Sequence, residues 1–176
     1  MANTSSLTVG LISDTHGLLR PQAVEALRGV HRIIHAGDIG GEEITRRSRA
    51  SPSGPPCRAL SEILAALRAL APVDAVRGNN DRGSWAERIP TELTLEVGGV
   101  AVHVLHDLKE LEMDPVQAGV KVVIAGHSHK PDVREQAGVL YVDPGSAGPR
   151  RFRLPVTVAH LHIASGTATA RICYIL

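Results

Sequence analysis

The sequence predicts an α/β fold, a layered domain in which helices cover the β-sheets. Strand and helix patterns alternate in the first half of the chain, whereas hairpin patterns dominate the second half. The chain has 176 residues, 43% of them apolar, which is enough to bury a substantial core. No shift in composition divides the chain, so we expect residues 1–176 to form a single domain.

Elements of the first half follow from hydrophobic spacing and from the residues that end each pattern. Short apolar runs that stop at polar residues and glycine predict strands at 7–13, 33–36 and 73–76. Apolar residues at helical spacing predict helices at 21–28 and 60–70, and residues 42–49 could form a further short helix. Between the last two helices, the proline and glycine of residues 51–56 exclude regular structure.

The second half is richer in strands, and we expect most of them to pair in antiparallel fashion. A Gly-Gly turn joins the first two strands, and turns that contain glycine join two further pairs. Another buried strand stands alone between the first two hairpins. The hairpins are predicted at 93–97 with 100–105, 133–135 with 139–142, and 156–163 with 167–175, and the single strand at 120–125.

Composition and charge exclude several classes of protein. No apolar run reaches the length of a transmembrane helix, and the N-terminus lacks the features of a signal peptide, so we expect a cytoplasmic protein. The net charge is +1 and only four residues are aromatic, which argues against a stable complex with nucleic acid. The two cysteines form no disulfide or zinc-binding pattern. The oligomeric state stays open, with a homo-oligomer as one option.

Polar residues that suit metal binding follow five of the predicted strands. The chain contains nine histidines and eight aspartates, and many of them lie beside glycines at strand ends. In open α/β sheets, sites form outside the carboxyl ends of strands, so these residues are expected to converge. In extended backbone, residues two apart point the same way, which would aim both members of an Asp-x-His or His-x-His pair at one place. The candidates are Asp14, His16, Asp38, Asn79, Asp81, His106, Asp107, His127 and His129.

This donor set mixes carboxylate, amide oxygen and imidazole, and it contains no thiolate. Such a mixture suits manganese, iron, zinc or nickel better than magnesium or calcium. Without Asp81 and Asp107, seven of these nine residues are candidate ligands, which is more than one ion needs. We therefore expect two divalent metal ions that share a bridging carboxylate, and manganese is the first choice of metal. The alternative is that these are ordinary turn residues, which would require five coincidences.

The motifs Asp14-x-His16, Gly37-Asp38, Gly78-Asn79-x-Asp81, His106 and Gly126-His127-x-His129 resemble the calcineurin-like metallophosphoesterase superfamily. Their order and the short length are similar to its small prokaryotic phosphodiesterase branch. The resemblance runs from about residue 8 to the C-terminus. It implies a layered αββα sandwich of two mixed β-sheets flanked by helices, with the metal site at the carboxyl ends of the strands.

The resemblance also implies roles for these residues. Asp14, His16 and His129 would hold one metal, Asn79, His106 and His127 would hold the other, and Asp38 would bridge both. The catalytic residues would be Asp38, Asn79 and His106. A metal-bridging hydroxide would attack a small or nucleotide-like phosphodiester.

Three residues near these motifs leave alternatives open. Asn80 stands where many relatives carry histidine, and an amide cannot act as a general acid. Asp107 follows His106 and is either a carboxylate that orients this histidine or a solvated surface acid. Asp81 either supports the metal loop or caps a turn, and the resemblance favours support.

Residues outside the motifs have simpler interpretations. Residues 46–58 resemble a flexible insertion, and its arginines at 46, 47 and 49 are either a basic lip for phosphate or solvated charges, the second being favoured. Gly145-Ser146 with Arg150 and Arg151 would cradle a distal phosphate or form a tight turn. His35 is predicted to be a core histidine. Ordinary structural roles are expected for His31, His103, His160 and His162.

The function predicted from the sequence is therefore a dinuclear, metal-dependent phosphodiesterase. Two alternatives remain. One is a non-catalytic protein-binding scaffold on the same fold, which would be free to lose ligands. The other is a phosphomonoesterase or nucleotide pyrophosphatase, which Asn80 makes less favoured for substrates with poor leaving groups.

Overall fold

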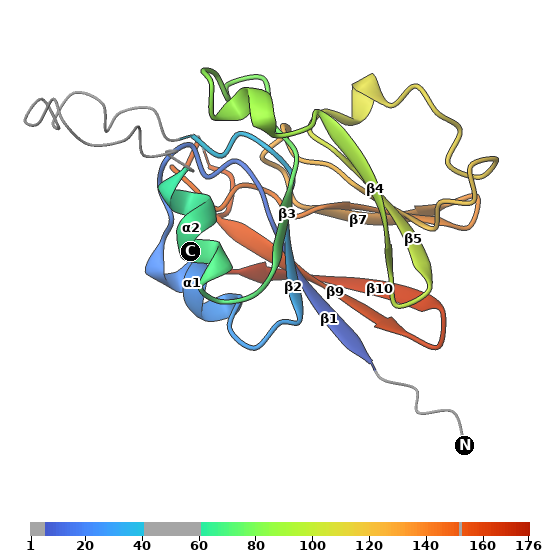
Figure 1. Cartoon of the computed structure of the whole chain (residues 1–176). Helices are drawn as coiled ribbons and strands as arrows, with labels where there is room; N and C mark the ends of the chain where they lie inside the picture. The colour runs from blue at the N-terminus through green and yellow to red at the C-terminus, as the bar shows by residue number, and fades with distance from the viewer. Residues whose placement is uncertain (1–5, 41–60, 152) are drawn as a thin grey trace, which may run out of the picture.

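The computed structural model describes residues 6–40, 61–151 and 153–176, and these form two five-stranded sheets that lie face to face (Figure 1). The predicted helix at 42–49 and the predicted insertion at 46–58 lie outside the described residues. Within the three described ranges, no helix has the length and apolar character needed to cross a membrane.

The first sheet has the strand order β10-β9-β1-β2-β3. Its three N-terminal strands run parallel, and the C-terminal hairpin of β9 and β10 joins them in antiparallel pairing. Its strands are β1 (Leu7–Ile12), β2 (Arg32–His35), β3 (Val73–Ala75), β9 (Thr157–Ala164) and β10 (Thr167–Tyr174). The sequence therefore located every strand of this sheet, with ends that differ by at most one residue.

The second sheet has the order β4-β5-β6-β8-β7. Its hairpins β4–β5 and β7–β8 are antiparallel, as predicted, whereas the central strand β6 pairs in parallel with β5 and β8. The connection from β5 to β6 crosses the outer face of the sheet instead of turning directly back, which makes the two strands parallel. The strands are β4 (Glu92–Val97), β5 (Val100–Leu105), β6 (Val122–Ile124), β7 (Asp132–Gln136) and β8 (Val139–Asp143).

Two helices cover the outer face of the first sheet, and Figure 1 shows them side by side. They are α1 (Pro21–Ala26) and α2 (Glu62–Arg68), and Pro21 occupies the first turn, where it costs no hydrogen bond. Their apolar faces, with Leu27 and Leu67 fully buried, pack on strand residues such as Ile33. The outer face of the second sheet is covered by the 3₁₀ helix η3 (Leu108–Glu110) and the segment after it.

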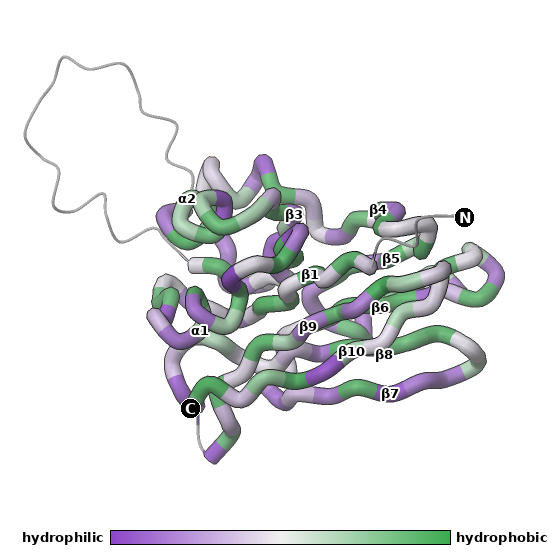
Figure 2. Tube along the Cα trace, turned by 90° about the horizontal axis from the view of Figure 1, so that it is seen from below, coloured by the Kyte–Doolittle hydropathy of each residue, from purple (hydrophilic) through white to green (hydrophobic). Residues whose placement is uncertain are grey.

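The main core lies between the two sheets. Its side chains are mostly valine, leucine and isoleucine, including Leu11, Ile34, Val102, Ile124 and Leu161. β-Branched residues favour strands because they pack well on a pleated surface, which explains why short apolar runs were sufficient to locate these elements. In Figure 2 the tube is green along much of β5 and β8, whereas the edge strand β7 is largely purple. The polar edge disfavours pairing with another chain.

Candidate metal centre

Loops that follow strands of both sheets meet at one end of the molecule. Hydrogen bonds join the backbones of these loops: Asp14 N–H donates to Gly37 O (3.0 Å), His16 N–H to Asp38 O (2.9 Å), and Gly126 N–H to His106 O (2.9 Å). The polar residues after β1, β2, β3, β5 and β6 are thereby brought close together, as the strand order requires.

Asp14, His16 and His129 form the first group of candidate ligands. The Nε2 atoms of His16 and His129 lie 3.8 Å and 3.2 Å from Asp14 Oδ1. The two imidazole rings are stacked, with centroids 5.3 Å apart. One ligand atom from each residue falls within a 4.8 Å cluster, which is compact enough to surround one metal ion.

Asp38 connects this group to a second one. Its Oδ2 lies 3.4 Å from His106 Nε2 and 3.9 Å from His16 Nε2. Asp14, Asp38 and His106 also have ligand atoms within 4.8 Å of one another. Asp38 thus occupies the position between the two groups that a bridging ligand needs, although its role as a ligand stays a prediction.

Asn79 and His127 complete the predicted set. Asn79 Oδ1 lies 3.1 Å from His127 Nδ1, and the ring of His127 meets that of His106 edge to face, with centroids 5.2 Å apart. Neither alternative given for Asp107 describes its position, because its carboxylate lies 3.6 Å from His127 Nε2. It does not orient His106, whose Nδ1–H already donates to the Ala36 carbonyl at 2.7 Å.

Backbone strain is concentrated in these loops. Five candidate ligands have positive φ angles between 45° and 68°, a region that side chains other than glycine rarely adopt. The expectation that residue pairs converge through extended backbone was therefore wrong, because both members of each pair turn into the left-handed region. Such strain costs about 1–3 kcal/mol per residue and tends to occur at functional sites. The five residues are Asp14, His16, Asp38, His127 and His129.

Two residues fix the loop that carries Asp38. The carboxylate of Asp81 accepts hydrogen bonds from the backbone N–H groups of Ile39, Gly40 and Gly78, at 2.8–3.1 Å. Asn80 donates to both oxygens of Asp38, from its backbone N–H to Oδ1 at 2.8 Å and from its side chain to Oδ2 at 2.6 Å. Sequence reasoning noted only what Asn80 cannot do and missed this contact, for which its position directly after Asn79 is the one available signal.

His35 links two of the loops from inside the core, and its contacts agree with the prediction that it is a core histidine whose ring is fully hydrogen-bonded. Thr15 Oγ1 donates to Ile39 O at 2.8 Å, so it accepts from His35 Nε2–H at 3.0 Å. His35 Nδ1 then accepts from Gly37 N–H at 3.2 Å. Burial lowers the pKa of His35 to about 3, which keeps the ring neutral as this pattern demands.

The electrostatics of the centre favour charged carboxylates. Burial alone would raise the pKa of Asp38, but the His106 ring 3.4 Å away and the hydrogen bonds from Asn80 outweigh it and hold that pKa well below its usual range. Burial would lower the pKa of His106, but the nearby Asp38 carboxylate and the hydrogen bond to the Ala36 carbonyl raise it to about 9. Asp38 and His106 therefore favour their charged forms, and a cation bound between them would take the place of the imidazolium charge.

Orphaned polar atoms test whether these residues fit divalent metals. Among the described residues, the fully buried Asp14 Oδ1 and the buried His106 Nε2 have no hydrogen-bond partner. Buried polar atoms are nearly always paired, so such atoms point to a missing partner. When a metal ligand, histidine usually donates its second nitrogen to a carbonyl or carboxylate, as His106 does to Ala36. The donor set and the orphaned atoms therefore fit divalent cations.

The remaining predictions fall at the edge of the site or away from it. Gly145 and Ser146 form the turn, because Ser146 Oγ donates to the Asp14 carbonyl and Gly145 N–H donates to Asp143. Arg151 reaches the centre, with Nη2 3.4 Å from His16 Nε2. The four histidines expected to be structural contact strand, loop or helix residues elsewhere: His31, His103, His160 and His162.

Asp143 lies near the centre and gives a testable pH dependence. Burial raises the pKa of its carboxyl group to about 7, although Ser128 and Gly145 donate hydrogen bonds to it. Because the folded protein holds this proton more tightly than the unfolded chain does, Asp143 stabilises the fold at pH values below its pKa in the unfolded chain, which is near 4. This stability is lost as the pH rises to the folded pKa of about 7. For the metal-free proteins, we expect the free energy of unfolding of the wild type to fall by about 2 kcal/mol relative to that of Asp143→Asn between pH 4 and pH 7. The full pKa shift would correspond to a larger loss, but water screens this partly exposed group. Urea denaturation at several pH values measures it, and parallel curves for the two proteins would contradict the raised pKa.

Comparison with known proteins identifies the family of this chain. The family described as the calcineurin-like phosphoesterase superfamily domain matches residues 7–166. A protein of Methanothermobacter thermautotrophicus named a probable metallophosphoesterase is 34% identical over 161 residues, which span 85% of this chain and 82% of that protein. An archaeal phosphodiesterase has the same fold with a TM-score of 0.68 and 22% identity, covering 95% of this chain and 100% of that one. Vps29 of Entamoeba histolytica, complexed with zinc, has a TM-score of 0.65 and 18% identity, covering 97% of this chain and 100% of that one.

The fold and the cluster of buried carboxylates and imidazoles therefore define a metal-dependent phosphoesterase. The chain belongs to the calcineurin-like phosphoesterase superfamily. This confirms the resemblance seen in the motifs and the expected architecture of two mixed sheets with helices.

Proposed function

We propose that the protein is a dinuclear, metal-dependent phosphodiesterase that hydrolyses small or nucleotide-like phosphodiesters. The observation that carries the proposal is the position of Asp38, whose Oδ2 lies within 4 Å of both His16 and His106, one from each candidate group. None of the seven predicted ligands is missing from the chain. A scaffold without catalysis would have no need to keep strained backbone at five of them.

The residues divide between two metals as the superfamily resemblance suggests. Asp14, His16 and His129 would hold one ion, Asn79, His106 and His127 would hold the other, and Asp38 would contact both. Two bound divalent cations would supply an activated water as the nucleophile and would neutralise the charge of the phosphate. We propose manganese as the first candidate. The cytoplasmic location and a homo-oligomer stay predictions.

The chain's own groups orient the centre and limit its substrates. Asn80 holds both oxygens of Asp38, so this carboxylate is fixed before any ligand arrives. The guanidinium of Arg151, beside His16, is placed to bind a phosphate oxygen. Because the Asn80 amide carries no acidic proton and is directed at Asp38, we propose that the favoured leaving groups need little protonation.

Metal stoichiometry and substrate preference test this function together. We expect calorimetry and elemental analysis to find two Mn²⁺ ions per wild-type chain. We expect bis(p-nitrophenyl) phosphate to be hydrolysed at least about tenfold faster than p-nitrophenyl phosphate. The third substrate class to be assayed is the 2′,3′-cyclic nucleotides. His127→Ala should lose one ion, whereas the matched control His162→Ala, whose exposed ring lies on β9, should keep both.

Each contrary result removes a specific part of the proposal. One ion per wild-type chain at saturation would exclude the dinuclear centre. Faster hydrolysis of the monoester would favour the phosphomonoesterase alternative. The absence of hydrolysis with all three substrate classes would favour the non-catalytic scaffold.

A further inference from the structure

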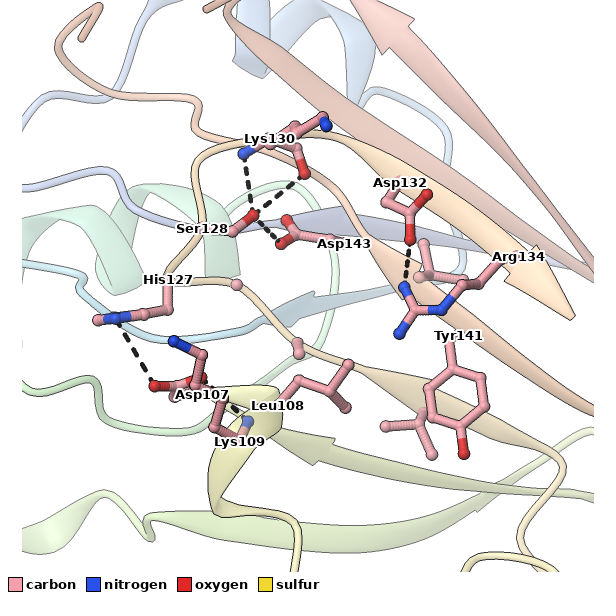
Figure 3. Close-up of a pocket in the computed structure, with 14 residues that line it drawn as sticks. Asp107, Leu108, Lys109, His127, Ser128, Lys130, Asp132, Arg134, Tyr141 and Asp143 are labelled. Atoms are coloured by element: carbon pink, nitrogen blue, oxygen red, sulfur yellow. Dashed lines mark hydrogen bonds and ion pairs between the residues drawn. The ribbon is translucent and has the colours of Figure 1, made fainter. Parts of the chain in front are cut away.

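A cavity of about 520 Å³ opens beside the candidate metal centre, on the outer face of the second sheet. Its size lies within the range of small-molecule sites, roughly 300–1,000 Å³. His127 and Asp107, which contact each other, line the cavity where it adjoins the centre, and Figure 3 shows this pair at its border. A group bound in this cavity would therefore lie next to any phosphate held at the metals.

The cavity has an apolar floor and a partial roof. Val123 of β6 and Ala125 of the loop after it are buried residues of the outer apolar cluster, and they line the floor of the cavity. Leu108 of η3 closes one side, and Tyr141 of β8 supplies the one aromatic ring among the lining residues. Covering apolar surface of this kind favours binding only when the ligand brings an apolar group that removes it from water.

Charges around the cavity are balanced. Three cationic side chains line it and three acidic ones do so, which leaves no excess of either sign: Lys109, Lys130 and Arg134 against Asp107, Asp132 and Asp143. Several are already engaged. Arg134 pairs with Asp132 and lies 5.1 Å from the centroid of the Tyr141 ring, and Ser128 donates to Asp143, as Figure 3 shows. Among the described residues, Lys109 and Lys130 form no ion pair, so the charges of the lining do not by themselves decide the charge of the bound group.

We propose that this cavity binds a ring-bearing ester group of the phosphodiester and thereby selects the substrate. The proposal rests on the proposed phosphodiesterase function and adds the substrate class. A diester carries a second organic group where a monoester carries none, so a cavity beside the centre gives that group a place to bind. The residues that determine the selectivity are Leu108 and Tyr141.

Binding of non-hydrolysable phosphinates tests the cavity apart from catalysis. Diphenylphosphinate and dimethylphosphinate carry the same charge, and their P–C bonds resist hydrolysis. We expect the manganese-loaded wild type to bind the diphenyl compound at least about tenfold more tightly by calorimetry, because burying one ring supplies that much. Leu108→Ala and Tyr141→Ala should each reduce this ratio at least about threefold. The matched control is Val133→Ala, a 38% exposed residue of β7 outside the cavity lining, and it should leave the ratio unchanged.

The outcomes separate this proposal from the function on which it rests. Equal binding of the two phosphinates, or a ratio that survives both cavity substitutions in folded variants, overturns the cavity proposal and leaves the phosphodiesterase intact. Selective binding that both substitutions weaken, in a protein that hydrolyses no diester, supports the cavity and overturns the function. Failure to bind either phosphinate overturns both.

Discussion

Replacing Asp38 with asparagine is expected to lower kcat/KM for bis(p-nitrophenyl) phosphate at least about 10³-fold, or about 4 kcal/mol of transition-state stabilisation. The carboxylate Oδ2 of Asp38 lies 3.4 Å from His106 Nε2 and 3.9 Å from His16 Nε2, so one substitution affects both groups of candidate ligands. An amide carries no charge and offers one oxygen, so it cannot bridge two cations as a carboxylate does. Steady-state kinetics at saturating Mn²⁺ measures the effect.

The control makes the same chemical change away from the centre. Asp74 on β3 pairs with Arg32 at 2.6 Å, and both side chains are about one-third exposed, so Asp74→Asn should cost less than about 1 kcal/mol of stability. Its kcat/KM should match the wild type. If Asp38→Asn binds two Mn²⁺ ions and retains more than a tenth of wild-type activity, Asp38 does not bridge the metals.

Adding a methyl group at Gly78 is expected to destabilise the fold strongly. A Cβ atom there would overlap the Oδ1 atom and the backbone nitrogen of Asp38, and backbone cannot yield as the end of a flexible side chain can. We expect Gly78→Ala to lower the free energy of unfolding by about 2–4 kcal/mol. It should also weaken Mn²⁺ binding, because Asp38 must move.

Gly138, in the turn between β7 and β8, supplies the comparison. Its φ of +74° is strained for alanine, but no atom within 4 Å would meet the new Cβ. Gly138→Ala should therefore cost only about 1–2 kcal/mol and leave Mn²⁺ affinity unchanged. Urea denaturation and calorimetry distinguish the two variants. Gly78 has no positive φ, so its loss would come from the steric contact alone; a near wild-type free energy of unfolding and Mn²⁺ affinity for Gly78→Ala would contradict the clash with Asp38.

Much of the fold could be predicted because its signals are local. Alternating or continuous apolar runs located all ten strands of the described structure, and the spacing of Ile63, Leu64 and Leu67 located α2. Pairing direction was harder to predict. The parallel arrangement of β5 and β6 depends on the path of residues 106–121 over the sheet, and no residue pattern in either strand encodes that path.

The motifs of the candidate site could be predicted from the sequence, whereas several contacts between their residues could not. Glycine beside His16, Asp38 or His127 signals a sharp turn within a few residues, so the motifs can be recognised along the chain. The partner of Asp107 was not predictable, because it is His127, twenty positions away, and the adjacent His106 is already held by Ala36. The contact of Asn80 with Asp38 joins residues 42 positions apart.

The sequence by itself determined the class of fold, the set of candidate ligands and the superfamily, because each rests on spacing within a short segment. Only the tertiary structure decided the left-handed backbone at five of those ligands, the position of Asp38 between the two groups and the cavity beside His127. The physical reason is distance along the chain. His127 N–H donates to Asp14 Oδ2 across 113 positions, and such a contact exists only after both sheets have packed and brought their loops together.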